Sequence, residues 1–61
     1  MSAKLAYSIA SAALAVDLSD RTIRGAIADG SLTAHYSGTK AVIDADDLRD
    51  WLASLPTRRA S

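Results

Sequence analysis

The sequence predicts a mainly α-helical domain with one small β-hairpin, in the order helix, helix, hairpin, helix. Apolar residues recur with helical spacing in three segments, and between the second and third segments the pattern changes to strict alternation. The length of 61 residues allows a single domain with a thin core. We expect this domain to cover residues 7–55, between an N-terminal extension (1–6) and a flexible basic tail (56–61).

The first helix is expected to begin after Ser8, because serine is a favoured N-cap residue. Apolar residues follow on one face: Ile9, Ala12, Ala13 and Val16. The alanines make this face flat, so another helix can approach closely. Asp17 ends the pattern, and aspartate tolerates the left-handed conformation that a tight turn needs.

A second helix is predicted immediately afterwards, capped by Ser19 and with Asp20 in its first turn, where a carboxylate is stabilised by the helix dipole. Gly30 is expected to end it. Its two sides differ: Ile23, Ala26 and Ile27 form the buried side, and Arg21, Arg24, Gly25 and Ala28 the exposed side. Because about two residues join the two helices, the geometry is that of a helix-turn-helix.

The hairpin and the third helix complete the predicted order. Alternation places Leu32, Ala34 and Tyr36 on one face and Thr33 and His35 on the other; a turn at 37–40 and a return strand at 41–43 follow. Asp44 begins the third helix with an Asp-x-x-Asp cap, and Pro56 marks its end. Its apolar residues are Leu48, Trp51, Leu52 and Leu55. We interpret Trp51 as the main core anchor rather than a ligand platform.

The composition gives no sign of catalysis. The chain has no cysteine, which excludes disulfides and thiolate metal sites and suits a reducing cytoplasm. His35 is the single histidine and has no second ligand nearby, so we predict no metal site. Hydrolysis or group transfer needs a nucleophile beside a base, a carboxylate pair in a cleft, or a metal. We therefore expect a protein that is not an enzyme, with no catalytic residue and no cofactor.

The apolar run that follows Lys4, residues 5–16, has two further interpretations. A membrane span needs about 20 apolar residues, and the chain has no such run, so we expect no membrane partner and a cytoplasmic location. A cation before an apolar stretch also resembles a signal peptide. Tyr7, Ser8 and Ser11 interrupt the stretch, which favours the first helix of the domain and leaves the signal peptide as the alternative.

Charges are unevenly distributed although the formal net charge is zero. Nucleic-acid-binding domains usually carry a basic excess, so neutrality alone disfavours that class. The acidic residues gather at 44–50, however, whereas these five cations lie outside that segment: Arg21, Arg24, Lys40, Arg58 and Arg59. We therefore expect one end of the molecule to be basic and another to be acidic.

Together these residues resemble the small excisionase-type DNA-binding domains, which are related to the winged helix-turn-helix of MerR-like regulators. The resemblance covers about Tyr7 to Leu55 and lies in YSIASAALAVDLSDRTIRGAIADGSLTA, in Gly38 and Lys40, and in IDADDLRDWL. It implies a winged helix-turn-helix whose second helix enters the major groove and whose hairpin is the wing. The sequence departs from the family pattern at Ser11, Asp17 and Gly25, where glutamate, glycine and a basic or large residue are usual.

The resemblance implies a DNA-binding surface made of the second helix and the hairpin. Its expected residues are Ser19, Arg21, Thr22, Arg24, Gly25, His35, Tyr36 and Lys40. Arginine can bond guanine with two hydrogen bonds, or it can bind phosphate. Lys40 is expected to reach an adjacent phosphate or the minor groove, and Ser19 serves chiefly as a cap. Asp20 either accepts a hydrogen bond from cytosine or stabilises the helix start.

The resemblance implies a phage-encoded excisionase. Such a protein binds attachment-site DNA cooperatively, bends it and assists an integrase in excisive recombination. Double-stranded DNA, a phage integrase and further copies of the chain are the expected partners. In self-association, the acidic third helix of one protomer would face the basic end of the next. Two alternatives remain open: a small winged-helix transcription regulator, and a protein-interaction module that does not bind DNA, which the neutral charge favours.

Overall fold

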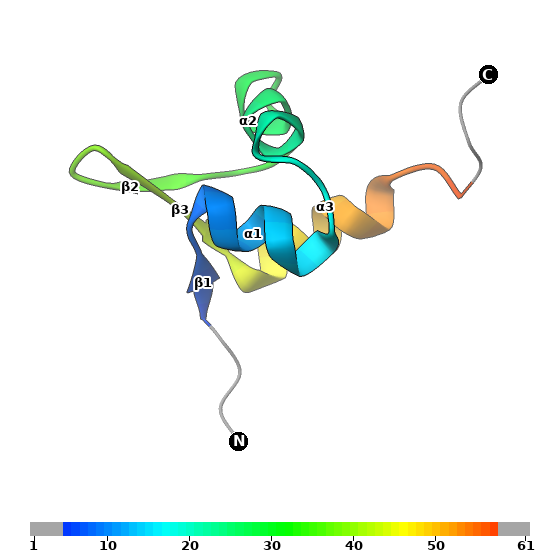
Figure 1. Cartoon of the computed structure of the whole chain (residues 1–61), viewed down its shortest axis with the longest axis horizontal. Helices are drawn as coiled ribbons and strands as arrows, with labels where there is room; N and C mark the ends of the chain where they lie inside the picture. Colours follow the sequence, from blue (N-terminus) through cyan, green and yellow to red (C-terminus); the bar gives the residue numbers. More distant parts are fainter. Residues whose placement is uncertain (1–4, 58–61) are drawn as a thin grey trace.

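The computed structural model describes residues 5–57, which form three helices and a three-stranded antiparallel sheet (Figure 1). The elements are β1 (Ala6–Tyr7), α1 (Ile9–Val16), α2 (Asp20–Ala28), β2 (His35–Ser37), β3 (Lys40–Asp44) and α3 (Ala45–Ser54). The helices and the hairpin follow the predicted order. The third strand, β1, makes the fold mixed α/β rather than mainly helical with a hairpin alone.

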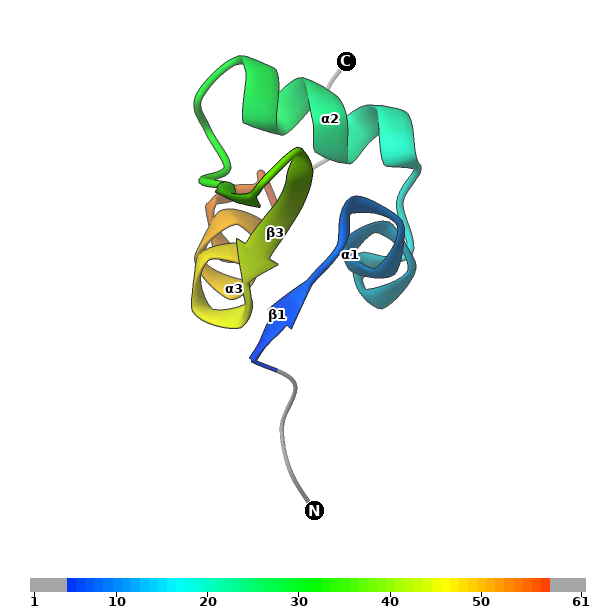
Figure 2. The same ribbon diagram turned by 90° about the vertical axis from the view of Figure 1, so that its left-hand side faces the viewer.

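The sheet is organised around β3, which lies between β1 and β2. Ala6, expected to lie in an N-terminal extension, pairs with Asp44, and Tyr7 pairs with Ile43. The carbonyl oxygen of Leu5 also accepts a hydrogen bond from the amide of Ala45 at 3.0 Å. The start of the described chain is therefore part of the folded domain. Figure 2 shows α1 and α3 on opposite sides of β1 and β3, with α2 across them.

The turn between α1 and α2 follows from local chemistry, as predicted. The Ser8 hydroxyl oxygen accepts a hydrogen bond from the Ser11 amide at 3.1 Å and caps α1. Asp17 ends α1 in the left-handed conformation, with φ 60° and ψ 40°. The Ser19 hydroxyl oxygen then accepts from the Thr22 amide at 3.1 Å and caps α2. Three residues therefore turn the chain from one capped helix into the next.

The core lies where the three helices meet β3. Eight buried residues form it: Ala12, Ala13, Ile23, Ala26, Leu32, Ile43, Leu48 and Trp51. The alanine face of α1 is in contact with α2, and Trp51 is buried, as predicted. Leu52, which shares the apolar spacing of α3, is 46% exposed. It lies at the rim of a shallow groove between α1 and α3 that no element of the described chain fills.

The segment before β2 continues the helix cap instead of forming a strand. Gly30 has a φ of 86°, and the amides of Ser31 and Leu32 both donate to the carbonyl oxygen of Ala26, at 3.0 and 3.1 Å. The predicted strand therefore begins at His35 rather than Leu32. Although Leu32 and Tyr36 were predicted to share a face, Leu32 is buried and Tyr36 is 64% exposed.

The loop after α2 contains a titratable contact. The Ser31 hydroxyl donates to Asp29 Oδ1 at 2.6 Å, and the Ser31 amide donates to the same oxygen at 2.9 Å. These two hydrogen bonds lower the pKa of Asp29 below its ordinary value of 3.8, the hydroxyl being the larger cause. A carboxyl whose pKa is depressed by folding stabilises the fold above its unfolded pKa, and this contribution disappears as the pH falls through the folded pKa.

Replacing Ser31 by alanine is accordingly expected to destabilise the domain more at pH 7 than at pH values well below 3.8. The measurement is the urea midpoint of both proteins across this pH range. The difference between the two midpoints should shrink as the solution becomes acidic. A difference that stays constant with pH would show that the hydroxyl acts by donating to its alternative acceptor, the carbonyl oxygen of Ala26 at 3.2 Å, and not to Asp29.

None of the helices formed by residues 5–57 is long and apolar enough to cross a membrane.

Candidate nucleic-acid interface

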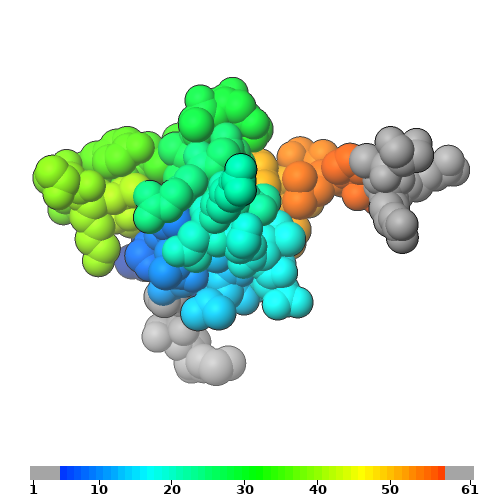
Figure 3. All heavy atoms as spheres, turned by 45° about the horizontal axis from the view of Figure 1, so that its top comes forward, coloured from blue at the N-terminus to red at the C-terminus, as the bar shows by residue number. Residues whose placement is uncertain are grey.

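An open groove runs between α2 and the hairpin, with the start of α1 at its floor. The groove contains a hollow of about 410 Å³. Its lining includes Ser8, Ile9, Asp20, Arg24, Tyr36 and Lys40. A second hollow of about 250 Å³ shares Ile9, Arg24 and Tyr36 with the first, so the two adjoin. In Figure 3, α2 and the hairpin project on either side of the atoms at the start of α1.

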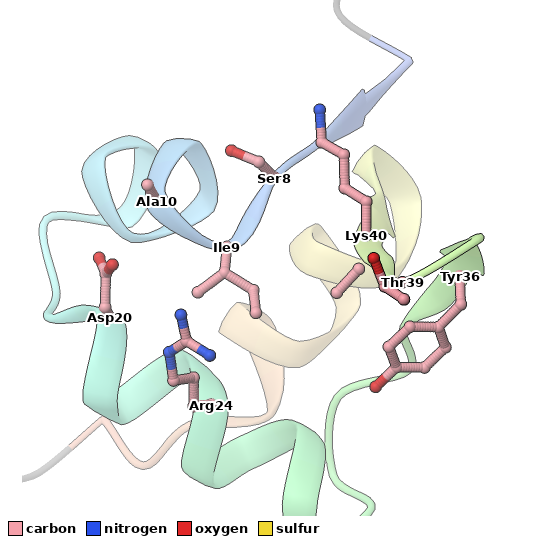
Figure 4. A pocket seen from close by; sticks show the side chains of 9 residues that line it. Ser8, Ile9, Ala10, Asp20, Arg24, Tyr36, Thr39 and Lys40 are labelled. Atoms are coloured by element: carbon pink, nitrogen blue, oxygen red, sulfur yellow. The ribbon is translucent and has the colours of Figure 1, made fainter.

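The groove brings together three of the residues predicted to contact DNA. Arg24 comes from the exposed side of α2, whereas Tyr36 and Lys40 come from β2 and β3 (Figure 4). Tyr36 is 64% exposed and lies against both hollows, and Arg24 lines both as well. Two cations and an aromatic ring therefore border one concave surface, an arrangement suited to a polyanion with stacked or flat groups.

The two arginines of α2 are open to solvent. Within residues 5–57 one contact of 4 Å or less joins a basic and an acidic side chain, between His35 Nε2 and Asp47 Oδ2 at 3.8 Å. It is an ion pair only when the histidine is protonated, and it does not involve Arg21 or Arg24. Both residues are exposed. Neither guanidinium group is neutralised by a carboxylate of the described chain, so both can meet an external anion without first breaking a pair.

The other predicted residues of α2 lie along its exposed side, outside the lining of the two hollows. Ser19 and Thr22 bond each other, with 2.9 Å between their hydroxyl oxygens, in addition to the N-cap contact. Arg21 precedes Thr22 on the exposed surface. Ser19 is thus a cap, as expected, and the Thr22 hydroxyl supports it.

Gly25 occupies the middle of α2 without a steric reason for glycine. A Cβ atom built there meets nothing within 4 Å, and its φ is not positive. Glycine inside a helix costs about 0.5–1 kcal/mol relative to alanine. We expect Gly25→Ala to raise the free energy of unfolding by about 0.5–1 kcal/mol in urea denaturation. A loss of stability would instead indicate a tightly packed surface at this position.

His35 does not belong to the groove. Successive residues of a strand point to opposite faces, and Tyr36 faces the groove. His35 accordingly lies near Asp47 of α3. The structure therefore places His35 apart from Tyr36 and Lys40, on the opposite face of β2, as the alternation indicated, and its expected contact with DNA stays a prediction.

The charged side chains are partly separated along the described chain. The described residues include all seven aspartates of the chain and four cations. Three of these cations belong to α2 and the hairpin: Arg21, Arg24 and Lys40. Four aspartates instead lie at the start of α3 and along it: Asp44, Asp46, Asp47 and Asp50. The separation expected from the sequence is only partial, because Asp20 lines the groove, Asp17 and Asp29 flank α2, and Arg49 lies on α3.

Sequence reasoning missed the part of the groove formed by the start of α1. Ser8 and Ile9 reach the hairpin because β1 pairs with β3, which holds the beginning of α1 beside β2 and β3. A strand of two residues has no alternation to detect. The signal that was available is weaker: Tyr7 directly precedes a serine cap and has a high strand propensity.

Comparison of the chain with models of protein families, with curated proteins and with solved structures gave no match. Its residues, and the positions in which the fold holds them, are therefore the basis for assigning a function.

Proposed function

We propose that the protein is a small winged helix-turn-helix DNA-binding protein, with α2 as the recognition helix and the β2–β3 hairpin as the wing. The observation that supports this most is the convergence of Arg24, Tyr36 and Lys40 on one groove. They come from three elements, α2, β2 and β3, and Arg24 lines the groove without an ion-pair partner in the described chain. Such a surface fits the phosphates and base edges of a duplex.

In this proposal α2 lies in the major groove and the hairpin follows the adjacent backbone. Arg21 and Arg24 either bond guanine or hold phosphates, and Lys40 holds a phosphate beside them. A bidentate contact between arginine and guanine is worth about 1–3 kcal/mol of discrimination. Tyr36 contributes its hydroxyl and the flat side of its ring between Arg24 and Lys40.

A single copy of so small a domain should bind weakly. One module of this kind buries about 600–1,000 Å² on DNA. Useful occupancy then requires several copies on adjacent sites or a partner bound nearby, because linked contacts multiply affinity. We therefore propose the role of an excisionase, in which several copies coat and bend attachment-site DNA beside an integrase.

The test is the salt dependence of binding to attachment-site and random-sequence duplexes. With about four phosphate contacts, affinity should fall on the order of a hundredfold between 50 and 200 mM salt. A protein-interaction module would show no retention on DNA at 50 mM salt. That result would overturn the proposal.

The footprint separates the two DNA-binding roles. An excisionase is expected to give an extended, cooperative footprint next to integrase sites. A transcription regulator that uses the same contacts would protect one compact operator, and this outcome would replace the recombination role while retaining the DNA contacts.

A further inference from the structure

A carboxylate lies within the otherwise cationic groove. Asp20 lines the same hollow as Arg24 and Lys40. Asp20 and Arg24 are four residues apart on α2, so their side chains share one face of the helix. Figure 4 shows both projecting from α2 toward the start of α1. They do not form an ion pair in the described chain, where the single ion pair is on the other side of the hairpin.

This position gives Asp20 two opposing effects. In the first turn of α2 its charge stabilises the helix through the dipole. Facing the groove, the same charge repels any phosphate that approaches Arg24 and Lys40. Because phosphates are present on a duplex of any sequence, the repulsion weakens binding to all DNA equally.

A base edge can offset this repulsion. In the major groove, cytosine presents an amino group, and aspartate accepts its hydrogen bond. Adenine also presents an amino group, but its N7 acceptor lies beside that group and repels a carboxylate, whereas guanine and thymine present only acceptors, which a carboxylate cannot bond. The cost of placing Asp20 against DNA is therefore recovered only where a suitable donor lies within its reach.

We propose that Asp20 is a specificity-determining residue, which lowers affinity for non-target duplexes and favours sites with a cytosine amino group near the start of α2. This inference rests on the proposed function. It assigns to Asp20 a role beyond starting a helix, and it predicts that a neutral side chain at this position makes the protein bind DNA more tightly and less selectively.

The experiment compares Asp20→Asn with Asp46→Asn as a matched control. Asp46 is also an exposed aspartate in the first turn of a helix, α3, but it does not line the groove. Both variants lose one negative charge and one favourable interaction with a helix dipole. At about 0.1 M salt we expect D20N to bind a random-sequence duplex about fivefold more tightly than the unmodified protein does. D46N should change this affinity by less than about twofold, because salt screens a charge that lies far from the DNA.

Base preference supplies the second measurement. Selection from a pool of randomised duplexes should enrich cytosine at one position with the unmodified protein and lose this preference with D20N. The variant Asp20→Glu, which retains the charge, should keep the lower affinity for random sequence. Circular dichroism of each variant establishes that the helices are intact.

The outcomes distinguish this inference from the proposed function. If the unmodified protein binds DNA but D20N and D46N change affinity equally, or if base preference is unaltered in D20N, the role of Asp20 is overturned and DNA binding stands. If none of the proteins binds duplex DNA at 50 mM salt, the proposed function fails and the inference fails with it.

Discussion

Replacing Arg24 by alanine is expected to weaken binding to duplex DNA by about tenfold to a hundredfold, the equivalent of one good arginine contact worth about 1–3 kcal/mol. Arg24 lines both hollows of the groove and has no ion-pair partner in the described chain. Because it is exposed, its removal should leave the fold intact. Fluorescence anisotropy with a labelled duplex measures the loss, and circular dichroism checks the fold.

Arg49→Ala is the matched control for this experiment. Arg49 is an exposed arginine on α3, at the groove between α1 and α3 and away from the hairpin. Its removal lowers the net charge by the same amount and should change affinity less than twofold, since distant exposed charges are screened. Equal losses in R24A and R49A would mean that binding depends on total charge, and the assignment of α2 as the recognition helix would be wrong.

Replacing Ile43 by alanine is expected to unfold the domain at room temperature. Ile43 lies in the central strand, pairs with Tyr7 of β1 and is fully buried in the core. Truncating a buried isoleucine to alanine costs about 2–5 kcal/mol. A core of this size rarely supplies more than about 3–5 kcal/mol of stability. The free energy lost in I43A is therefore similar to the whole free energy of unfolding of the domain.

Urea denaturation followed by the fluorescence of Trp51 gives the measurement. Ile43→Val serves as the conservative control and should cost only about 0.5–1.5 kcal/mol, leaving a cooperative transition. An I43A protein with a transition as steep and as late as that of the unmodified chain would show that the central strand contributes little to the core.

The ends of the helices could be predicted because each is decided by nearby residues. A hydroxyl or carboxylate oxygen that accepts from an amide two or three residues ahead is sufficient to begin a helix, and Ser8, Ser19 and Asp44 each do so. Asp17 and Gly30 adopt positive φ at the two positions where the chain must leave a helix. These features depend on a few consecutive residues, which the sequence displays directly.

The features that were missed depend on residues far apart in the chain. The two residues of β1 form a strand only because β3 is available to pair with them. Leu52 matches the apolar spacing of α3, yet it is exposed because the groove beside it is not covered. His35 alternates correctly with Tyr36, but the position of α3 decides that it faces Asp47. Spacing gives the face on which a residue lies, and the packing of the other elements decides what covers that face.

Only part of the candidate site could be predicted from the sequence, because the rest depends on how distant elements pack. Arg24 could be identified as exposed from the period of α2 alone, and Lys40 from its place in the hairpin turn. That they share a groove with Tyr36 and the start of α1 required the three-dimensional arrangement. The sequence offered two roles for Asp20, at the helix start and toward cytosine, but it could not show that this carboxylate lines the same hollow as Arg24 and Lys40.

The most direct test of the account is a titration of the isotope-labelled protein with a short duplex, followed by the amide resonances in NMR spectra. The predicted result is that the amides of α2 from Arg21 to Gly25 and those of Thr39 and Lys40 shift, while the amides of α3 from Asp46 to Ser54 stay in place. Shifts confined to α3, or no shifts at 50 mM salt, would contradict the claim that α2 and the hairpin form the surface that binds DNA.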